Sequence, residues 1–139
     1  MNDWKVFALG SAFFAALTAV FAKVGVAQIN SNFATLIRTL LISLLVAVIM
    51  TYRQEWASPS SIDRKTWIFL ILSALATGLS WLCYYRALQI GAVSKVAPID
   101  KMSLALTIIL SVVFLGEKLD IKTFLATALI FSGTLILVL

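Results

Sequence analysis

The 139-residue chain is 62% hydrophobic, only 12% charged and carries a net charge of +5. Its mean hydropathy of +1.05 excludes an ordinary soluble domain and indicates an integral membrane protein, whose first partner is the lipid bilayer. Histidine is absent and there is one cysteine, which excludes an intramolecular disulfide, a Cys/His metal site and a histidine proton relay. We expect no cofactor, no metal ion and no nucleic-acid partner.

Five apolar segments follow one another, each near the ~20 residues that span ~30 Å of hydrocarbon as a helix. They are residues 4–26, 33–52, 66–88, 96–115 and 121–139. Runs such as Leu40 to Met50 are apolar on every face, which excludes the alternating pattern of barrel strands. The sequence predicts an all-α membrane protein, in which residues 1–139 form one domain of five transmembrane helices.

An odd number of spans places the two ends of the chain on opposite sides of the membrane. Six Lys and Arg residues fall on the N-terminal side of the spans and five on the other side. If Arg38 and Lys101 are embedded in the bundle, the remaining excess favours a cytoplasmic N-terminus in the cell membrane. The near balance also allows dual topology, in which two copies lie antiparallel in one membrane.

Three charged positions within the spans are candidates for function: Arg38, Asp100 and Lys101. Arg38 is the deepest cation, about 9 Å into its helix from the end at Asn32, and a structural role is the alternative. Asp100 follows Pro98 by two residues, so it either sits in the first turn of a helix or marks a proline-broken entry into one. In the second case Pro98 breaks the helix, and Asp100 pairs with Arg38 or Arg86.

Small and hydroxyl residues recur at helical spacing along every segment. A purely structural explanation is close helix packing with interhelical hydrogen bonds. The alternative is that some of these stripes line a solute pathway, most of all where aromatic residues accompany them. The candidates for the pathway are Arg38, Thr77, Ser80, Trp81, Tyr84, Asp100, Lys101, Ser103 and Thr107.

Two stretches carry a family resemblance. Residues 84–98 read YYRALQIGAVSKVAP, and residues 114–118 read FLGEK. This order of a tyrosine and Ala-Leu helix end, an early proline and a Gly-Glu turn resembles the EamA repeat of the drug/metabolite transporter superfamily. The resemblance implies two five-helix repeats, inverted around a central cavity and working by alternating access. This chain has one repeat and is similar to half-size members, in which an antiparallel homodimer completes the ten helices.

The leading hypothesis is therefore a transporter of small solutes, metabolite or drug-like, at the interface of such a homodimer. The cations on one face favour an anionic or zwitterionic substrate, or a lipid headgroup. A lipid-carrier flippase subunit and a membrane scaffold without transport are the alternatives. We do not expect an enzyme, because the sequence shows no carboxylate pair, metal cluster or activated nucleophile.

Overall fold

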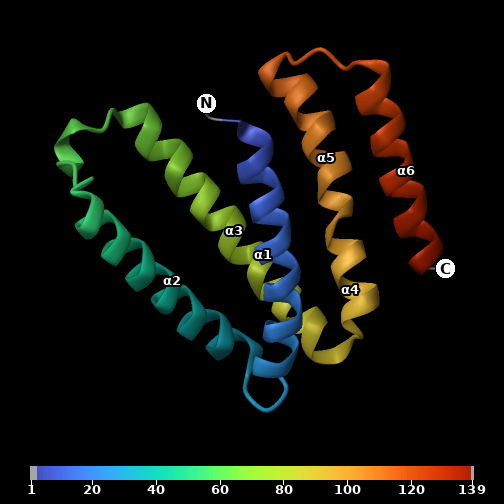
Figure 1. The fold of residues 1–139 in the computed structure, drawn as a ribbon, viewed down its shortest axis with the longest axis horizontal. Coiled ribbons are helices and arrows are strands. Elements are labelled where there is room, and N and C mark those ends of the chain that lie inside the picture. Colours follow the sequence, from blue (N-terminus) through green and yellow to red (C-terminus); the bar gives the residue numbers. More distant parts are fainter. Residues whose placement is uncertain (1–2, 139) are drawn as a thin grey trace. The chain divides into compact units, whose positions relative to one another are not determined.

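The computed structural model describes residues 3–138 of the chain, and within them it is all-helical (Figure 1). The predicted all-α fold is thus confirmed, while residues 1, 2 and 139 of the predicted domain lie outside the described residues. The elements are α1 (Trp4–Gly25), α2 (Ser31–Arg53), the 3₁₀ turn η1 (Pro59–Ser61), α3 (Arg64–Ile90), α4 (Val93–Asp100), α5 (Met102–Leu110), the π turn η2 (Ser111–Leu115) and α6 (Ile121–Val138).

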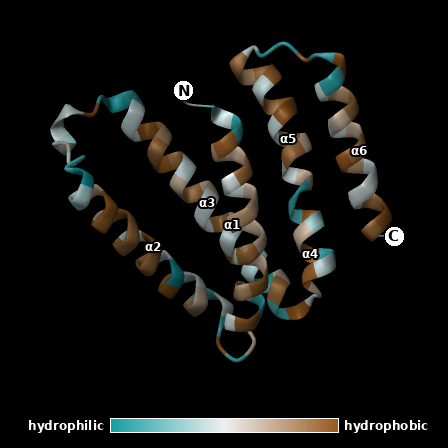
Figure 2. Ribbon diagram, in the orientation of Figure 1, coloured by the Kyte–Doolittle hydropathy of each residue, from teal (hydrophilic) through white to brown (hydrophobic). Residues whose placement is uncertain are grey.

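Among the described residues, four stretches are long and apolar enough to cross a membrane: α1, α2, α3 and the run Val93–Leu115. The fifth predicted span is the shorter helix α6, whose 18 residues extend over about 27 Å. That length lies close to the ~30 Å of a bilayer core. Hydrophilic residues gather at the helix ends and connections, and apolar residues along the helix middles (Figure 2).

The described residues divide into two compact units. One runs from Phe21 to Gln89 and contains the end of α1, all of α2 and nearly all of α3. The other combines the residues up to Val20 with those from Ile90 onward, and within it α6 packs along both α4 and α5.

Side-chain caps set where α2, α3 and α6 begin. Asn30 Oδ1 accepts the backbone N–H groups of Asn32 and Phe33, so α2 starts two residues before the predicted position. At the start of α3, the hydroxyl of Thr66 holds the pKa of Asp63 below its usual value, helped by the N–H groups of Thr66 and Lys65. The pKa of Asp120 is lowered in the same way before α6.

The predicted helix over residues 96–115 is interrupted, and it begins earlier, at Val93. Pro98 lies inside α4 and has no N–H for the carbonyl of Ser94, so the regular hydrogen-bond ladder is lost there. Lys101 N–H donates to the Pro98 carbonyl at 3.0 Å, which is a tighter, three-residue turn. The chain therefore changes from α4 to α5 at Lys101, three residues after the proline.

Helix α6 contacts the backbone at this break. The hydroxyl of Thr134, a residue only 4% exposed, lies 2.8 Å from the Ile130 carbonyl of its own helix and 3.4 Å from the Pro98 carbonyl. One hydroxyl hydrogen serves these two acceptors. A buried polar contact thus joins α6 to the turn where the α4–α5 run departs from helical geometry.

Gly116 closes the π turn η2 in the left-handed conformation, with φ at 68°. Its N–H and that of Glu117 both donate to the carbonyl of Ser111, which satisfies this carbonyl at the end of the helix. Glycine adopts this conformation without a steric penalty. The Gly-Glu pair noted in the sequence is therefore the C-cap that precedes α6.

Replacing Gly116 with alanine tests the cap. No atom lies within 4 Å of the added Cβ, so the cost is the backbone conformation itself, about 1–2 kcal/mol lost from the free energy of unfolding. Gly133→Ala, equally open but inside α6, is the matched control and is expected to be neutral or stabilising by up to about 1 kcal/mol. Chemical unfolding in detergent micelles measures both, and equal effects would contradict the assignment.

Candidate functional site

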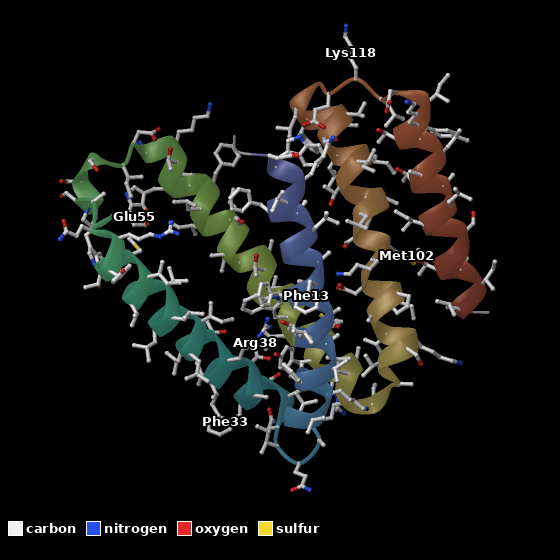
Figure 3. All side chains as sticks on the ribbon, viewed as in Figure 1. Phe13, Phe33, Arg38, Glu55, Met102 and Lys118 are labelled. Atoms are coloured by element: carbon white, nitrogen blue, oxygen red, sulfur yellow. The ribbon has the colours of Figure 1, made fainter. Side chains whose placement is uncertain are left out.

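A cation held against two aromatic rings is the most distinctive feature of the unit from Phe21 to Gln89. Arg38 lies on α2, seven residues after its first residue Ser31 and so about 10 Å along the helix. Its guanidinium carbon is 4.4 Å from the centroid of the Trp81 ring and 5.3 Å from that of Tyr85, both on α3. Figure 3 shows the Arg38 side chain reaching out from α2. We call these three residues the Arg38 cluster.

Helical spacing on α3 produces the aromatic side of the cluster. Trp81 and Tyr85 are four residues apart and therefore share one face of the helix. Tyr85 is 4% exposed, and the ring of Tyr84 meets it edge-on with a centroid distance of 6.4 Å. A guanidinium over such rings gains roughly 0.5–2 kcal/mol from cation–π attraction, the larger value applying where water is excluded.

The Arg38 guanidinium has no carboxylate partner in the described part of the chain. The ion pairs there join Arg53 to Glu55 at 3.7 Å and Lys101 to Asp100 at 3.3 Å. No described side chain or backbone group accepts a hydrogen bond from Arg38, and none of its nitrogens is sealed from solvent. The five N–H donors of this guanidinium are thus available.

The two acidic residues of this unit lie at the opposite end of its helices. Glu55 follows α2 and Asp63 precedes α3, and Arg38 is 15 residues, about 22 Å, from the last residue of α2 at Arg53. The end that holds Arg38 also carries Lys23 and Arg86 and no acid. The local charge is therefore positive and favours an anion.

Two side chains tie the ends of α1 and α3 together by capping each other's helix. Lys23 Nζ donates to the carbonyl of Leu88 at 2.6 Å. In return, Gln89 Nε2 donates to the carbonyls of Val26 at 3.1 Å and Ile29 at 2.9 Å. Arg86 orients this amide by donating to Gln89 Oε1 at 2.7 Å. We call this arrangement the reciprocal cap.

The reciprocal cap positions the start of α2 and therefore the Arg38 cluster. Ile29 immediately precedes the N-cap residue Asn30, so a hydrogen bond to Ile29 holds the connection from which α2 begins. Val26 and Leu88 on either side of the cap are completely buried. Carbonyls at the ends of helices lack partners of their own, and inside a membrane each unsatisfied group costs several kcal/mol.

The hydroxyl stripes of α2 and α3 differ in what they bind. On α2 the hydroxyls of Thr35, Thr39 and Ser43 each donate to the carbonyl four residues earlier. On α3 the predicted pathway residues Thr77 and Ser80 are exposed, and neither hydroxyl has a hydrogen-bond partner among the described residues. Of the two stripes, that of α3 is the one with free donors.

The remaining predicted residues lie in the other unit, around the break between α4 and α5. Because α4 begins at Val93, Asp100 is its last residue, and the alternative that placed Asp100 in a first helical turn is wrong. Its carboxylate pairs with the adjacent Lys101, and a pairing with Arg38 or Arg86 stays a prediction. On α5 the exposed Thr107 donates its hydroxyl to the carbonyl of Ser103.

Tyr85 of the Arg38 cluster and Gln89 of the reciprocal cap were not among the sequence candidates. Tyr85 was passed over for Tyr84, although its spacing of four from Trp81 places it on the face that meets Arg38. The sequence gives no sign that Gln89 is more than a polar residue of a loop. Its hydrogen bonds to the Val26 and Ile29 carbonyls form only because the ends of α1 and α3 lie together. The family-like run YYRALQ thus contains both residues.

The other unit contains an apolar cavity of about 400 Å³ between α5 and α6, in its part from Ile90 onward. Met102, Leu106, Phe124 and Phe131 are among the residues that line it. The hydroxyl of Thr127 in its wall donates to the Thr123 carbonyl of the same helix. The cavity therefore offers no polar group for orienting a charged solute.

Comparison with known proteins agrees with this helical, membrane-spanning architecture. Residues 3–139 match the model of the EamA-like transporter family. The chain belongs to this family. It is a membrane transporter by family, and the RALQ segment, Pro98 and the Gly116-Glu117 turn are where its sequence resembled the EamA repeat.

Two relatives were found. A Sinorhizobium protein named "Uncharacterized transporter in cobO 3'region" is 55% identical over 136 residues, which are 98% of this chain and 96% of that protein. An uncharacterized protein of Methanocaldococcus jannaschii is 33% identical over 75 residues, 54% of this chain and 55% of the relative. No solved structure matches the chain.

Replacing Gln89 with alanine tests the reciprocal cap. The substitution removes two hydrogen bonds to helix-end carbonyls and is expected to lower the free energy of unfolding by about 1–2 kcal/mol. Gln28→Ala, an exposed glutamine in the same connection, is the control and should change stability by less than about 0.5 kcal/mol. Unfolding in detergent micelles gives the comparison, and indistinguishable variants would show that the cap does not hold the two helix ends.

Proposed function

We propose that two antiparallel copies of this chain form a transporter of small anionic or zwitterionic solutes that works by alternating access. The observation that carries the proposal is the Arg38 cluster. It holds a cation about 10 Å into a transmembrane helix, against aromatic rings and away from any carboxylate of its unit.

The energetic cost of this arginine supports a functional role. Placing a charged residue deep in a membrane helix costs roughly 2.5–3.5 kcal/mol on insertion scales, and such residues usually mark substrate or ion pathways. Two aromatic contacts offset part of this cost but satisfy none of the N–H donors of Arg38. A negatively charged group of a solute would supply both the missing charge and the missing acceptors.

The pathway residues follow from the position of the cluster on α3. Thr77 lies one helical turn before Trp81 on the same face, and Ser80 and Tyr84 flank that face. We propose that these residues line the pathway together with Asp100, Lys101, Ser103 and Thr107 at the α4–α5 break. Irregular backbone within a membrane span is tolerated where it is buried in protein or lines a water-filled cavity.

The sequence and the comparisons support the second copy. The family model spans residues 3–139 once, and the Sinorhizobium relative is matched over 96% of its length, which leaves it no room for another repeat. Five spans cannot by themselves form two opposed halves. The nearly equal Lys and Arg counts on the two sides, six and five, permit insertion in both orientations.

A lipid-carrier flippase subunit is the second candidate, favoured by the free donors of Arg38. Guanidinium groups bind phosphate as readily as carboxylate. A lipid whose headgroup carries phosphate would meet the same cation on its way between the leaflets.

Transport by the purified protein in lipid vesicles tests the proposed substrate charge. With a panel of radiolabelled carboxylates, phosphates, amino acids and organic cations, we expect uptake of anions or zwitterions and none of cations. Arg38→Gln should reduce that uptake at least tenfold, because the solute loses its only deep cation on α2. Arg53→Gln, the same change at the exposed end of the same helix, is the control and should keep uptake within twofold.

Three results would decide against solute transport. Selective uptake of cations would contradict the proposed charge of the pathway. Movement of a labelled phosphate lipid between leaflets, without uptake of any soluble solute, would favour the flippase. Vesicles that pass nothing from the panel would favour a membrane scaffold.

Reporters fused to the C-terminus test the antiparallel pair. In cells that lack any homologous half-size partner, a reporter active in the cytoplasm and one active outside it should both give signal from the same chain. Adding two lysines after Ala57, in the exposed loop before the cap at Asp63, should shift the population strongly toward one orientation and abolish uptake, because the inverted copy is lost. Signal from one side alone, with transport intact, would exclude the antiparallel homodimer.

A further inference from the structure

The Arg38 cluster leaves one part of the guanidinium in use and another part free. Trp81 and Tyr85 contact the cation through their rings, with Cζ at 4.4 Å and 5.3 Å from the two centroids. Contact with an aromatic ring engages the charge of the group, and no described residue accepts a hydrogen bond from its N–H donors. The N–H edge is therefore the part that remains for a ligand.

From this we infer that Arg38 is a binding site for a planar or tetrahedral oxyanion, a carboxylate or a phosphate, that accepts two parallel hydrogen bonds from the guanidinium edge. The inference rests on the proposed function and deepens it, because it names the chemical group of the solute and the geometry of its recognition. Trp81 and Tyr85 are positioning residues that hold the guanidinium so that its edge is presented.

The surroundings of the cluster agree with an oxyanion. The described residues place no carboxylate within 4.0 Å of Arg38, and the acids of its unit, Glu55 and Asp63, lie beyond the far ends of α2 and α3. Glu55 pairs with Arg53, and Asp63 accepts hydrogen bonds at the start of α3. Within the unit from Phe21 to Gln89, neither acid is therefore placed to compete with a ligand for Arg38.

Nearby cations are already engaged, which singles out Arg38. Lys23 donates to the Leu88 carbonyl, and Arg86 donates to Gln89. Both add positive charge at this end of the helices, which attracts an anion, and each donates a hydrogen bond within the reciprocal cap. Arg38 is the cation of this group with no hydrogen-bond acceptor among the described residues.

An arginine is required by this geometry, and a lysine would not replace it. The lysine ammonium is a compact point charge without a planar fork, so it can neither lie over the two rings in the same way nor donate two parallel hydrogen bonds. Arg38→Lys keeps the charge and removes the fork. This substitution therefore separates recognition of an oxyanion by shape from attraction of any anion by charge.

The first experiment uses the unaltered chain in detergent micelles and the arginine reagent phenylglyoxal. Mass spectrometry measures the rates at which Arg38 and Arg53 are modified in the presence of inorganic phosphate or acetate. Tetramethylammonium chloride at equal ionic strength is the control. We expect phosphate or acetate to slow modification of Arg38 at least fivefold in a saturable manner, and to leave Arg53 unchanged. Equal protection of both arginines, or none of Arg38 by either anion, would overturn the inference.

A second arm distinguishes a soluble anion from a lipid headgroup. The protein is placed in nanodiscs of phosphatidylcholine or of phosphatidylcholine with phosphatidic acid, with no other anion but chloride. Protection of Arg38 by phosphatidic acid alone would identify a lipid phosphate as the source of the oxyanion, and protection by soluble phosphate or acetate in phosphatidylcholine would identify a free solute. Either result supports an oxyanion site.

The third arm tests the fork. In a chain with Trp4, Trp56 and Trp67 replaced by phenylalanine, Trp81 emission reports binding of the same anions. We expect Arg38→Lys to weaken binding at least tenfold and Arg53→Lys to change it less than twofold. Binding by the Arg38→Lys variant within twofold of the parent would overturn the inference. If the Arg38→Lys variant does not fold, the protection of Arg38 measured on the unaltered chain tests the inference instead.

The outcomes are separable from those of the transport assay. Saturable protection of Arg38 without uptake by vesicles would keep the oxyanion site and refute transport. Anion uptake that is unchanged in Arg38→Lys would keep transport of anions and refute recognition through the guanidinium edge.

Discussion

The structure depends on one constraint, which is that backbone polar groups inside hydrocarbon have to find partners within the protein. Regular helices pair their backbone groups along their length. Backbone groups left unpaired at helix ends and breaks form hydrogen bonds with side chains. Lys23 and Gln89 cap the ends of α1 and α3 for each other. Thr134 reaches the Pro98 carbonyl where α4 gives way to α5, and Gly116 closes the end of the π turn. Among the pathway candidates, Thr107 likewise donates its hydroxyl to a backbone carbonyl, that of Ser103.

Arg38 departs from this pattern, since its donors have no partner among the described residues. Aromatic rings stabilise its charge, and the reciprocal cap holds the start of the helix that carries it. In the proposed transporter, these unpartnered donors are the groups that would bind an anionic solute. The same reasoning separates the two hydroxyl stripes. On α2 the hydroxyls are bound to their own backbone, whereas Thr77 and Ser80 on α3 are free.

Much of the fold could be predicted from the sequence because membrane spans are set by hydrophobic length. The start at Trp4 of α1 was predicted to the residue, and α6 begins at the predicted Ile121. The predicted helix boundaries were wrong where a side-chain cap or a helix break sets the boundary. Asn30 moves the start of α2, and the helix predicted to begin at residue 96 begins at Val93, which places Asp100 at a helix end. Arg38 and Trp81 could be chosen as site residues, and the spacing of four places Tyr85 on the same helix face as Trp81. Gln89 could not be chosen, because the carbonyls that it binds lie 63 and 60 positions earlier in the chain.

The sequence by itself determined the class of protein, its all-helical fold and its membership of the EamA-like transporter family. These properties follow from hydropathy, residue spacing and local turn residues, none of which requires knowledge of the tertiary contacts. The tertiary structure decided which polar residues are already bonded and which are free. Pairing of Lys23 with the Leu88 carbonyl and contact of Arg38 with Trp81 and Tyr85 join residues more than 40 positions apart. Such contacts depend on how helices pack, and no local pattern in the chain encodes them.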